Sequence, residues 1–179
     1  MEYAEIIDFW FDEIDPGLWF KKNEAFDQLL RQRFSTVHRS AAEGELYAWR
    51  RQPDGRVAEI IVLDQFSRNM FRNSAQAFAY DNVALVLSQV AIEAGDDQRV
   101  DPSHRAFLYM PFMHSESPLI HQQAVKLFAQ PGLELNLEFE LKHKAIIDRF
   151  GRYPHRNAAL GRESTGEELE FLQQPGSSF

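Results

Sequence analysis

Apolar residues recur along most of this chain at the three- and four-residue spacing of an amphipathic helix. Within residues 23–44, for example, Phe26, Leu30 and Phe34 fall on one helical face, and Gly44 suits the end of that helix. Glycine and proline interrupt the pattern along the chain. The pattern therefore predicts about eight helices in short antiparallel pairs, an all-α fold.

Proline and glycine set the expected ends of several helices. The Pro-Asp-Gly run at residues 53–55 is expected to end a short helix over 45–52 and to precede a longer one over 56–72. Pro111 is expected to end the helix over 103–110 in the same way, because proline cannot continue a hydrogen-bonded helix.

Two further helices near the C-terminus are predicted from other signals. Residues 133–141 alternate between apolar and polar positions as a strand would, but their unbroken continuation to Gly151 favours a helix. Ser164 is predicted to cap the last helix, with Glu167 reaching back as in a capping box. A strand over residues 133–141 is the main alternative to an all-helical chain.

The composition is that of an ordinary globular protein. A chain of 179 residues suggests one domain over residues 1–179, with a frayed tail at 173–179. Its 15 phenylalanines indicate an aromatic-rich core, and the lack of cysteine removes disulfides, thiol nucleophiles and thiolate metal sites. No apolar run is long enough to span a membrane and the N-terminus is acidic, so we expect a cytoplasmic protein.

The formal net charge of −8 is unevenly distributed. Residues 142–162 hold six lysines and arginines against Asp148 alone, a net charge of +5, which leaves −13 for the rest of the chain. An acidic protein repels nucleic acid and anionic membranes, so we expect neither as a partner. The basic segment instead predicts contacts with small anions or with the chain's own acids.

The polar end of the most hydrophobic segment, VLDQFSRNMFR at 62–72, is the first candidate site. Asp64 and Arg68 are spaced to pair across one helical turn. One interpretation is a solvated, salt-bridged face, which spacing alone favours and which would contribute little stability. The other is a cavity wall in which Asp64 holds Arg68 in place. The candidate ligand-binding residues are Asp64, Gln65, Arg68, Asn69 and Arg72.

The second candidate is the tight connection expected between Pro111 and the Ser-Pro pair at 117–118. It holds His114 and Glu116, residue types that serve acid–base chemistry, and such connections often carry function. Capping of helix ends is the alternative role for both. Tyr109 precedes them and is a candidate for ligand contact, although core packing is the simpler expectation.

The third candidate is the basic segment itself. Arginine offers a fixed fork of donors that suits carboxylate and phosphate, and helix N-termini attract anions. The start of the last helix near Ser164 therefore predicts an anion pocket, while the alternative is that the arginines pair with the chain's many acids. The candidate residues are Arg149, Arg152, His155, Arg156, Asn157 and Arg162.

Metal and cofactor motifs are weak or absent. Glu140 and His143 have the spacing of half a carboxylate-bridged di-iron site, but the second copy is missing. A site built from His114, Glu116 and His143 would require the fold to bring them together. Phosphate-binding loops, dinucleotide-binding glycine motifs and G-x-S-x-G are absent, so we expect no cofactor, no nucleotide-binding fold and no serine hydrolase of the usual kind.

Five motifs spread over essentially the whole chain carry a family resemblance. They are WFKK (19–22), LDQFSRNMFR (63–72), AFAYD (77–81), RAFLYMPFMHSE (105–116) and RFGRYPHRNAALGRESTGEELEFL (149–172). In this order they resemble the bacterial family catalogued as domain of unknown function 924. The resemblance implies a tetratricopeptide-like fold, in which antiparallel helix pairs stack into a compact right-handed superhelix, and it implies no reaction.

Two positions depart from the family pattern. Ser67 stands where many members have proline, and Asn73 stands where a glycine usually follows the arginine. Asparagine tolerates a left-handed turn next best after glycine, so the helix exit is expected to be kept. Because the shared motifs include all three candidate sites, we expect these sites to meet in one cavity on the concave side.

Three functions remain as hypotheses. The first is a binding module whose concave cavity holds an anionic small molecule or a peptide carboxylate or phosphate. The second is a hydrolase or transferase in which His114 or His155 is the acid–base catalyst, tuned by Glu116 or Asp64, with arginines stabilising charge. The third is a structural protein with a buried polar network. Exposed apolar stripes on a short superhelix would also support a homodimer.

Overall fold

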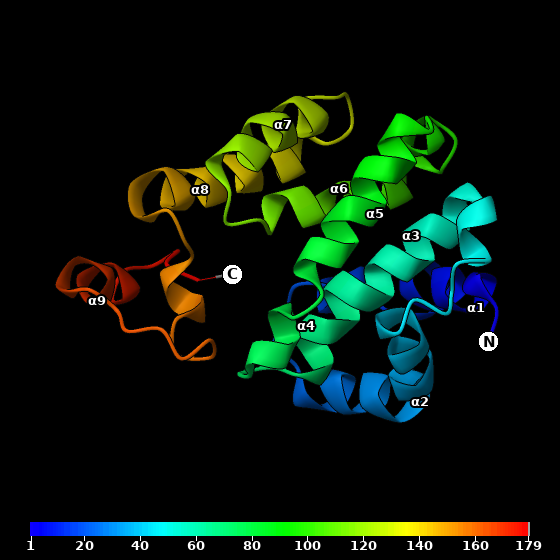
Figure 1. Cartoon of the computed structure of the whole chain (residues 1–179), viewed down its shortest axis with the longest axis horizontal. Helices are drawn as coiled ribbons and strands as arrows, with labels where there is room; N and C mark the ends of the chain where they lie inside the picture. Colours follow the sequence, from blue (N-terminus) through cyan, green and yellow to red (C-terminus); the bar gives the residue numbers. More distant parts are fainter. Residues whose placement is uncertain (179) are drawn as a thin grey trace. The chain divides into compact units, whose positions relative to one another are not determined.

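The computed structural model describes residues 1–178, and the regular structure within them is entirely helical (Figure 1). The α-helices are α1 (Tyr3–Asp8), α2 (Glu24–Ala42), α3 (Pro53–Ile61), α4 (Ser67–Met70), α5 (Asp81–Glu93), α6 (Pro102–Met113), α7 (Pro118–Phe128), α8 (Glu134–Phe150) and α9 (Gly166–Leu172). The predicted all-α fold is confirmed, including helix α8 where a strand was the alternative. Phe179, the last residue of the predicted frayed tail, lies outside the described residues. Within residues 1–178, no helix combines the length and apolar character needed to cross a membrane.

Shorter helical segments extend or join the α-helices. Two are π-helices, Phe9–Glu13 after α1 and Val62–Phe66 between α3 and α4. The others are 3₁₀-helices at Pro16–Leu18, Trp49–Arg51, Ala75–Phe78, Asp96–Gln98 and Pro154–Arg156. The single helix predicted over 56–72 is therefore a run of α3, a wider π turn and α4.

The contacts gather into two compact units, which are described separately. The N-terminal unit comprises Met1–Arg72 and Gln76–Pro111, and the C-terminal unit comprises Asn73–Ala75 and residues 112–178. The expectation of one domain over the whole chain stays a prediction, and so does the stacking of helix pairs into a superhelix.

Aromatic rings form the centre of the N-terminal unit. Phe9, Trp10, Phe34 and Phe66 are fully buried. The ring centroids of Phe9 and Phe34 lie 4.6 Å apart, and those of Phe34 and Phe66 lie 5.1 Å apart, within the range of favourable aromatic pairs. Around this core α1 packs on α3, α2 packs on α4, and α3 lies beside α5 (Figure 1). The aromatic-rich core that the composition predicts is confirmed.

In the C-terminal unit, α7 and α8 pack side by side (Figure 1). Ile146 and Ile147 of α8 form a buried cluster with Tyr153, and Phe150 and Phe171 pack against it. Tyr153 follows α8 in the segment that leads to the 3₁₀-helix Pro154–Arg156, so its position depends on how α8 ends. This unit also holds the basic segment of the sequence.

Two proline positions differ from the predictions. Pro53 was expected to help end a short helix over 45–52, but it begins α3, because the first helical position needs no N–H donor. Gly55 therefore lies inside α3, and the residues before Pro53 form turns and a 3₁₀-helix in place of the predicted α-helix over 45–52. Pro111 lies inside α6, which continues to Met113, so its missing N–H affects only the last turn.

The cap of the last helix is shifted by one residue from the prediction. Thr165, not Ser164, is the N-cap: its Oγ1 accepts from the N–H of Glu168 at 3.2 Å. Glu168, not Glu167, reaches back, and its Oε2 accepts from the N–H of Thr165 at 2.8 Å. The sequence has two adjacent candidate caps, Ser164 and Thr165, followed three residues later by Glu167 and Glu168. The spacing of a capping box therefore fits either pair equally well.

The helix ends predicted at Gly44 and Gly151 are confirmed, and both exits are left-handed. Gly44 and Gly151 follow α2 and α8 with φ of 75° and 69°. Asn73 has a φ of 66° and is the non-glycine residue with positive φ in the described chain. Asparagine therefore makes the left-handed turn that was expected at this position.

Replacing Gly55 by alanine is expected to lower the free energy of unfolding by about 3 kcal/mol. A Cβ at this position would lie 2.1 Å from the backbone carbonyl oxygen of Trp49, so the chain before α3 would have to move. Urea denaturation measures the loss. Gly166→Ala in α9 is the matched control, because an added Cβ there meets nothing within 4 Å and should change stability by less than about 0.5 kcal/mol. Equal losses in both variants would contradict the steric explanation.

Candidate functional site

The motif segment of the N-terminal unit forms a buried charge network. Asp64 and Gln65 lie in the π-helix Val62–Phe66 and are 1% and 5% exposed. Arg68 places Nη1 3.0 Å from Asp64 Oδ1 and donates both Nη atoms to Asp81 of α5 at 2.9 Å. Gln65 Nε2 donates to Asp64 Oδ2 at 2.6 Å. The predicted Asp64–Arg68 pair is confirmed, but the solvated face that spacing favoured is wrong, because partners on other helices allow these charges to be buried.

A second network joins the same motif to α2. Asp27 of α2, only 4% exposed, accepts from Asn69 Nδ2 at 2.9 Å and from Arg72 Nε and Nη2 at 2.6 and 2.8 Å. These hydrogen bonds to Asp27 act against burial and raise the pKa of Arg72, which therefore stays charged. Asn69 and Arg72 thus hold α4 against α2.

Two more residues of this unit have defined hydrogen bonds. Ser67 donates from Oγ to the Leu63 carbonyl at 2.6 Å and accepts from Nε2 of His38 at 2.8 Å. Tyr109 is fully buried and donates its hydroxyl proton to Asp97 Oδ2 at 2.6 Å. Tyr109 is therefore part of the core, which confirms the simpler expectation that it serves core packing.

In the C-terminal unit, the predicted anion pocket at the start of α9 is filled by the chain's own Glu168. Its carboxylate accepts from Arg152 Nε and Nη2 at 2.7 and 2.8 Å, from the Thr165 N–H at 2.8 Å and from Asn157 Nδ2 at 3.3 Å. The hydrogen bond from Arg152, followed by those from the backbone and Asn157, lowers the pKa of Glu168 to about 2. The expectation of an external anion between Arg152 and this helix start is corrected accordingly.

Glu116 forms a second internal partner for the basic segment. It accepts from Arg162 Nη1 and Nη2 at 2.7 and 2.9 Å and from the Tyr153 N–H at 2.7 Å. Burial alone would raise the pKa of Glu116, but the hydrogen bonds from Arg162 and Tyr153 outweigh it and lower this pKa. Arg162 also donates from Nε to Asn157 Oδ1 at 2.9 Å, so these residues form one connected network.

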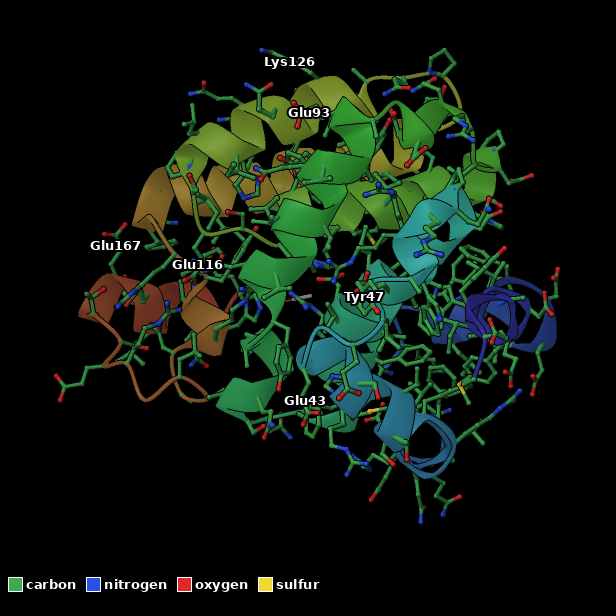
Figure 2. All side chains as sticks on the ribbon, turned by 45° about the vertical axis from the view of Figure 1, so that its right-hand side comes forward. Glu43, Tyr47, Glu93, Glu116, Lys126 and Glu167 are labelled. Carbon is green, nitrogen blue, oxygen red and sulfur yellow. The ribbon has the colours of Figure 1, made fainter. Side chains whose placement is uncertain are left out.

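Arg149 lies apart from that network. It pairs with Glu167 at 2.7 Å, and the Arg149 side chain is 47% exposed. Figure 2 labels Glu116 and Glu167, the carboxylates that accept from Arg162 and Arg149. Solvent screens such an exposed pair, so it contributes little to stability.

Several histidines of the C-terminal unit gather around the ring of Tyr153. The ring centroid of Tyr153 lies 5.5 Å from that of His155, 5.8 Å from that of His143 and 6.3 Å from that of His121. The ring centroid of His114 lies 6.4 Å from that of His143, so four of the six histidines of the sequence are neighbours. The guanidinium of Arg156 lies 4.6 Å over the Tyr153 ring, a favourable cation–π distance. We name this set, Tyr153, His114, His121, His143, His155 and Arg156, the Tyr153 cluster.

Burial controls the charge of His143 in this cluster. Together with the smaller effects of the neighbouring His114, His121 and His155, it outweighs the hydrogen bond to Phe139 and lowers the pKa of His143 to about 3. His143 is therefore neutral at pH 7, and its Nδ1 donates to the Phe139 carbonyl at 2.8 Å. Arg156 donates from Nη2 to the His114 carbonyl at 3.0 Å, which ties the connection before α7 to the cluster.

Sequence reasoning missed the partner of Glu140. The Glu-x-x-His spacing pairs it with His143, but its Oε1 lies 2.7 Å from Nδ1 of His121 on α7. Burial raises the pKa of Glu140 despite the opposing effect of His121. The available signal was that His121 shares a helical face with the apolar Ala124 and Phe128, which predicts a buried polar partner on a neighbouring helix.

The structure thus divides the predicted site residues. Asp64, Gln65, Arg68, Asn69, Arg72 and Tyr109 belong to networks of the N-terminal unit. In the C-terminal unit His114, His155 and Arg156 join the Tyr153 cluster, while Arg152, Asn157 and Arg162 bind internal carboxylates. Across residues 1–178, no group of three His, Asp or Glu side chains is placed to hold a metal ion. His114, Glu116 and His143 therefore do not form the metal site that would have required the fold to bring them together.

Comparison with known proteins gives a consistent identity. A solved structure of a protein of unknown function from Agrobacterium tumefaciens is 41% identical to this chain, with 96% of each chain covered and a TM-score of 0.90. No curated protein matches the chain in sequence. Residues 6–176 match the family described as bacterial protein of unknown function, DUF924. Since this match spans nearly all of the chain and the motifs described above, the protein belongs to the DUF924 family.

Proposed function

We propose that this protein is a binding module for a small anionic ligand, a phosphate or carboxylate, and that the Tyr153 cluster makes the main contacts. One observation carries the proposal: three of the six histidines and the Arg156 guanidinium lie around a single buried tyrosine, and a fourth histidine, His114, lies beside His143. The stack of helix pairs that the family resemblance implies would present a concave surface for such a ligand. A cytoplasmic location is part of the proposal, and the lack of cysteine is compatible with it.

The chemistry of the cluster suits an anion. Imidazoles donate through N–H groups, and a guanidinium adds charged donors in a fixed fork. Two carboxyl groups of the same unit, Glu116 and Glu140, already have partners in Arg162 and His121. The groups that the Tyr153 cluster offers a ligand are therefore imidazoles and a guanidinium, which suit a phosphate or a carboxylate.

Electrostatics favours the same ligand class. His114, His121 and His155 all lower the pKa of His143, so the imidazoles oppose one another's protonation. A bound anion would reverse this effect, because an opposite charge within a few ångströms stabilises imidazolium. His114 and His155 are half-buried, so a small ligand can reach them without unfolding the core.

Inorganic phosphate at 100 times its dissociation constant is expected to stabilise the folded protein by about 2.7 kcal/mol. Thermal unfolding measures this against chloride at matched ionic strength, with acetate and citrate as carboxylate probes. His155→Gln or His114→Gln, by weakening binding tenfold, should reduce the gain to about 1.4 kcal/mol at the same phosphate concentration. Both positions are half-buried, so the variants are expected to fold.

His104→Gln in the N-terminal unit is the matched control and should keep the full stabilisation. His104 stacks on Phe11 with ring centroids 3.9 Å apart and lies outside the Tyr153 cluster. A flat response to every anion would reject the binding function. An equal response in all three variants would move the site away from the cluster. An acidic phosphopeptide, compared with its unphosphorylated form, distinguishes a peptide ligand from a free anion.

A second candidate function is acid–base catalysis at an ester or phosphate. The observation in its favour is a hydrogen-bonded chain from the carboxyl of Glu140 through His121 to the hydroxyl of Tyr153. In this proposal His114 or His155 would exchange protons with a substrate, while arginines would stabilise developing charge. Turnover of generic aryl phosphates or esters that disappears in His155→Gln would support it. Binding without turnover would favour the binding module.

A further inference from the structure

The pair formed by His121 of α7 and Glu140 of α8 is completely enclosed. Both side chains have an exposure of 0%, and Nδ1 of His121 lies 2.7 Å from Oε1 of Glu140. The pair lies where the two longest helices of the C-terminal unit pack together. A proton placed in this pair can reach water only if the packing of α7 and α8 opens.

The other nitrogen of His121 has a fixed role. Nε2 lies 2.8 Å from the carbonyl oxygen of Ser115 and 3.2 Å from the hydroxyl oxygen of Tyr153. A carbonyl oxygen can only accept, and the Tyr153 hydroxyl uses its own proton to donate to the Met113 carbonyl at 2.6 Å. Both neighbours of Nε2 are therefore acceptors, so Nε2 carries a proton.

This assignment determines what lies between His121 and Glu140. Without a proton between them, the lone pair of Nδ1 would face a negatively charged oxygen at 2.7 Å in a fully buried site, which is strongly repulsive. One proton must therefore lie between Nδ1 and Oε1. It belongs either to Glu140 as a neutral acid or to His121 as an imidazolium beside a carboxylate.

The second oxygen of Glu140 distinguishes these two forms. Oε2 is buried and has no hydrogen-bond partner. A carboxylate oxygen left in this way would carry half of a buried negative charge with nothing to solvate it, whereas the carbonyl oxygen of a neutral acid tolerates such a place far better. Glu59 of the N-terminal unit provides the contrast, because both of its oxygens accept from Arg50 at 2.6 Å.

The charges that face the pair come from several elements. On α8, Lys144 favours ionised Glu140 and Asp148 opposes it, while burial is the largest influence and raises the pKa of Glu140. Neutral His143 lies on the same helix. From the segment after α8 come Tyr153 and the Arg156 guanidinium over its ring. The connection before α7 contributes the Ser115 carbonyl, which is uncharged.

We infer that Glu140 is a protonated, neutral acid at neutral pH, and that it donates its proton to His121, which in turn holds Tyr153 and the Ser115 carbonyl in place. The pair is thus a buried proton-binding site. With the proton bound, His121 holds two features in place: the connection that carries His114, and the Tyr153 ring at the centre of the cluster. His121 and Glu140 are positioning residues. The inference does not depend on the proposed ligand.

The test compares Glu140→Gln with Glu59→Gln in the full chain. Glutamine reproduces a protonated carboxyl, since its amide can donate to Nδ1 of His121, so the melting temperature of Glu140→Gln should stay within about 2 °C of the wild type at pH 7. Glu59→Gln is the matched control and should melt far lower, because it removes the charge that Arg50 requires. As pH rises from about 4.5, where the unfolded chain releases this proton, towards the raised pKa of Glu140 in the folded state, the wild type should lose stability relative to Glu140→Gln, because only the folded state still holds the proton.

Spectroscopy on the wild type gives an independent result if Glu140→Gln does not fold. One glutamate side-chain carbon should keep the ¹³C shift of a protonated carboxyl from pH 5 to pH 7, while His121 shows the ¹⁵N pattern of a neutral imidazole with its proton on Nε2. A carboxylate signal from every glutamate at pH 7, together with an imidazolium pattern at His121, would overturn the inference. So would a Glu140→Gln variant that melts as low as Glu59→Gln.

Discussion

Asp27→Ala is expected to lower the free energy of unfolding by about 4 kcal/mol. The substitution removes the carboxylate that accepts from Asn69 and twice from Arg72, and it leaves a partly buried guanidinium without its partner. Removing one member of a buried pair costs far more than the pair itself contributes, since the remaining charge stays desolvated. Urea denaturation at pH 7 measures the difference.

Glu43→Ala is the matched control, because Glu43 is an exposed acid at the C-terminal end of the same helix (Figure 2). Its loss should change stability by less than about 0.5 kcal/mol. A double variant with Arg72→Met should recover part of the loss of Asp27→Ala, since it removes the stranded charge. If Asp27→Ala costs no more than Glu43→Ala, the motif arginine is not held by Asp27 and a ligand role for Arg72 gains support.

Acidification is expected to destabilise the protein through His143. Its pKa is about 3 in the folded state and near 6.5 in the unfolded chain, so between these values the unfolded chain binds one more proton. Stability therefore falls as pH drops below about 6.5, by up to about 1.4 kcal/mol per pH unit from this residue and by about 5 kcal/mol over the whole window. Urea denaturation at half-unit steps from pH 7 to pH 4.5 measures the slope.

The contribution of His143 is isolated by subtraction. His143→Gln cannot take up a proton, so the difference between wild type and variant should shrink or change sign as pH falls, at the slope given above. Parallel curves for wild type and His143→Gln would mean that the folded state protonates His143 as readily as the unfolded chain does.

Helix positions could be predicted from the sequence where the signal is local. The apolar spacing around Phe34 and the left-handed exits at Gly44 and Asn73 depend on residues within one or two turns, and all were predicted. Pro53 was misassigned because Pro-Asp-Gly suits both a helix start and a turn. The π-helix at Val62–Phe66 has no sequence signal of its own, since its residues fit an α-helix equally well.

The candidate site was predictable only in part, because sequence spacing reveals a partner only when it is close along the chain. Asp64 and Arg68 are four residues apart, and helical spacing reveals such a pair. Arg72 meets an acid 45 residues earlier, and Arg162 meets one 46 residues earlier. Partners that far apart depend on tertiary packing, so the sequence pointed to the polar residues without indicating that most of them bind the chain's own carboxylates.

The π turn at Val62–Phe66 also determines in which direction around the helix axis the side chains after Phe66 project. Each residue advances an α-helix by about 100°, so one residue more or fewer before Ser67 rotates every later side chain by that angle. Arg68 meets Asp81, and Arg72 meets Asp27, only in the present phase. The number of residues in the motif therefore matters to the structure as much as their identity. A relative that lost one residue here could keep the RNMFR sequence and still lose both contacts.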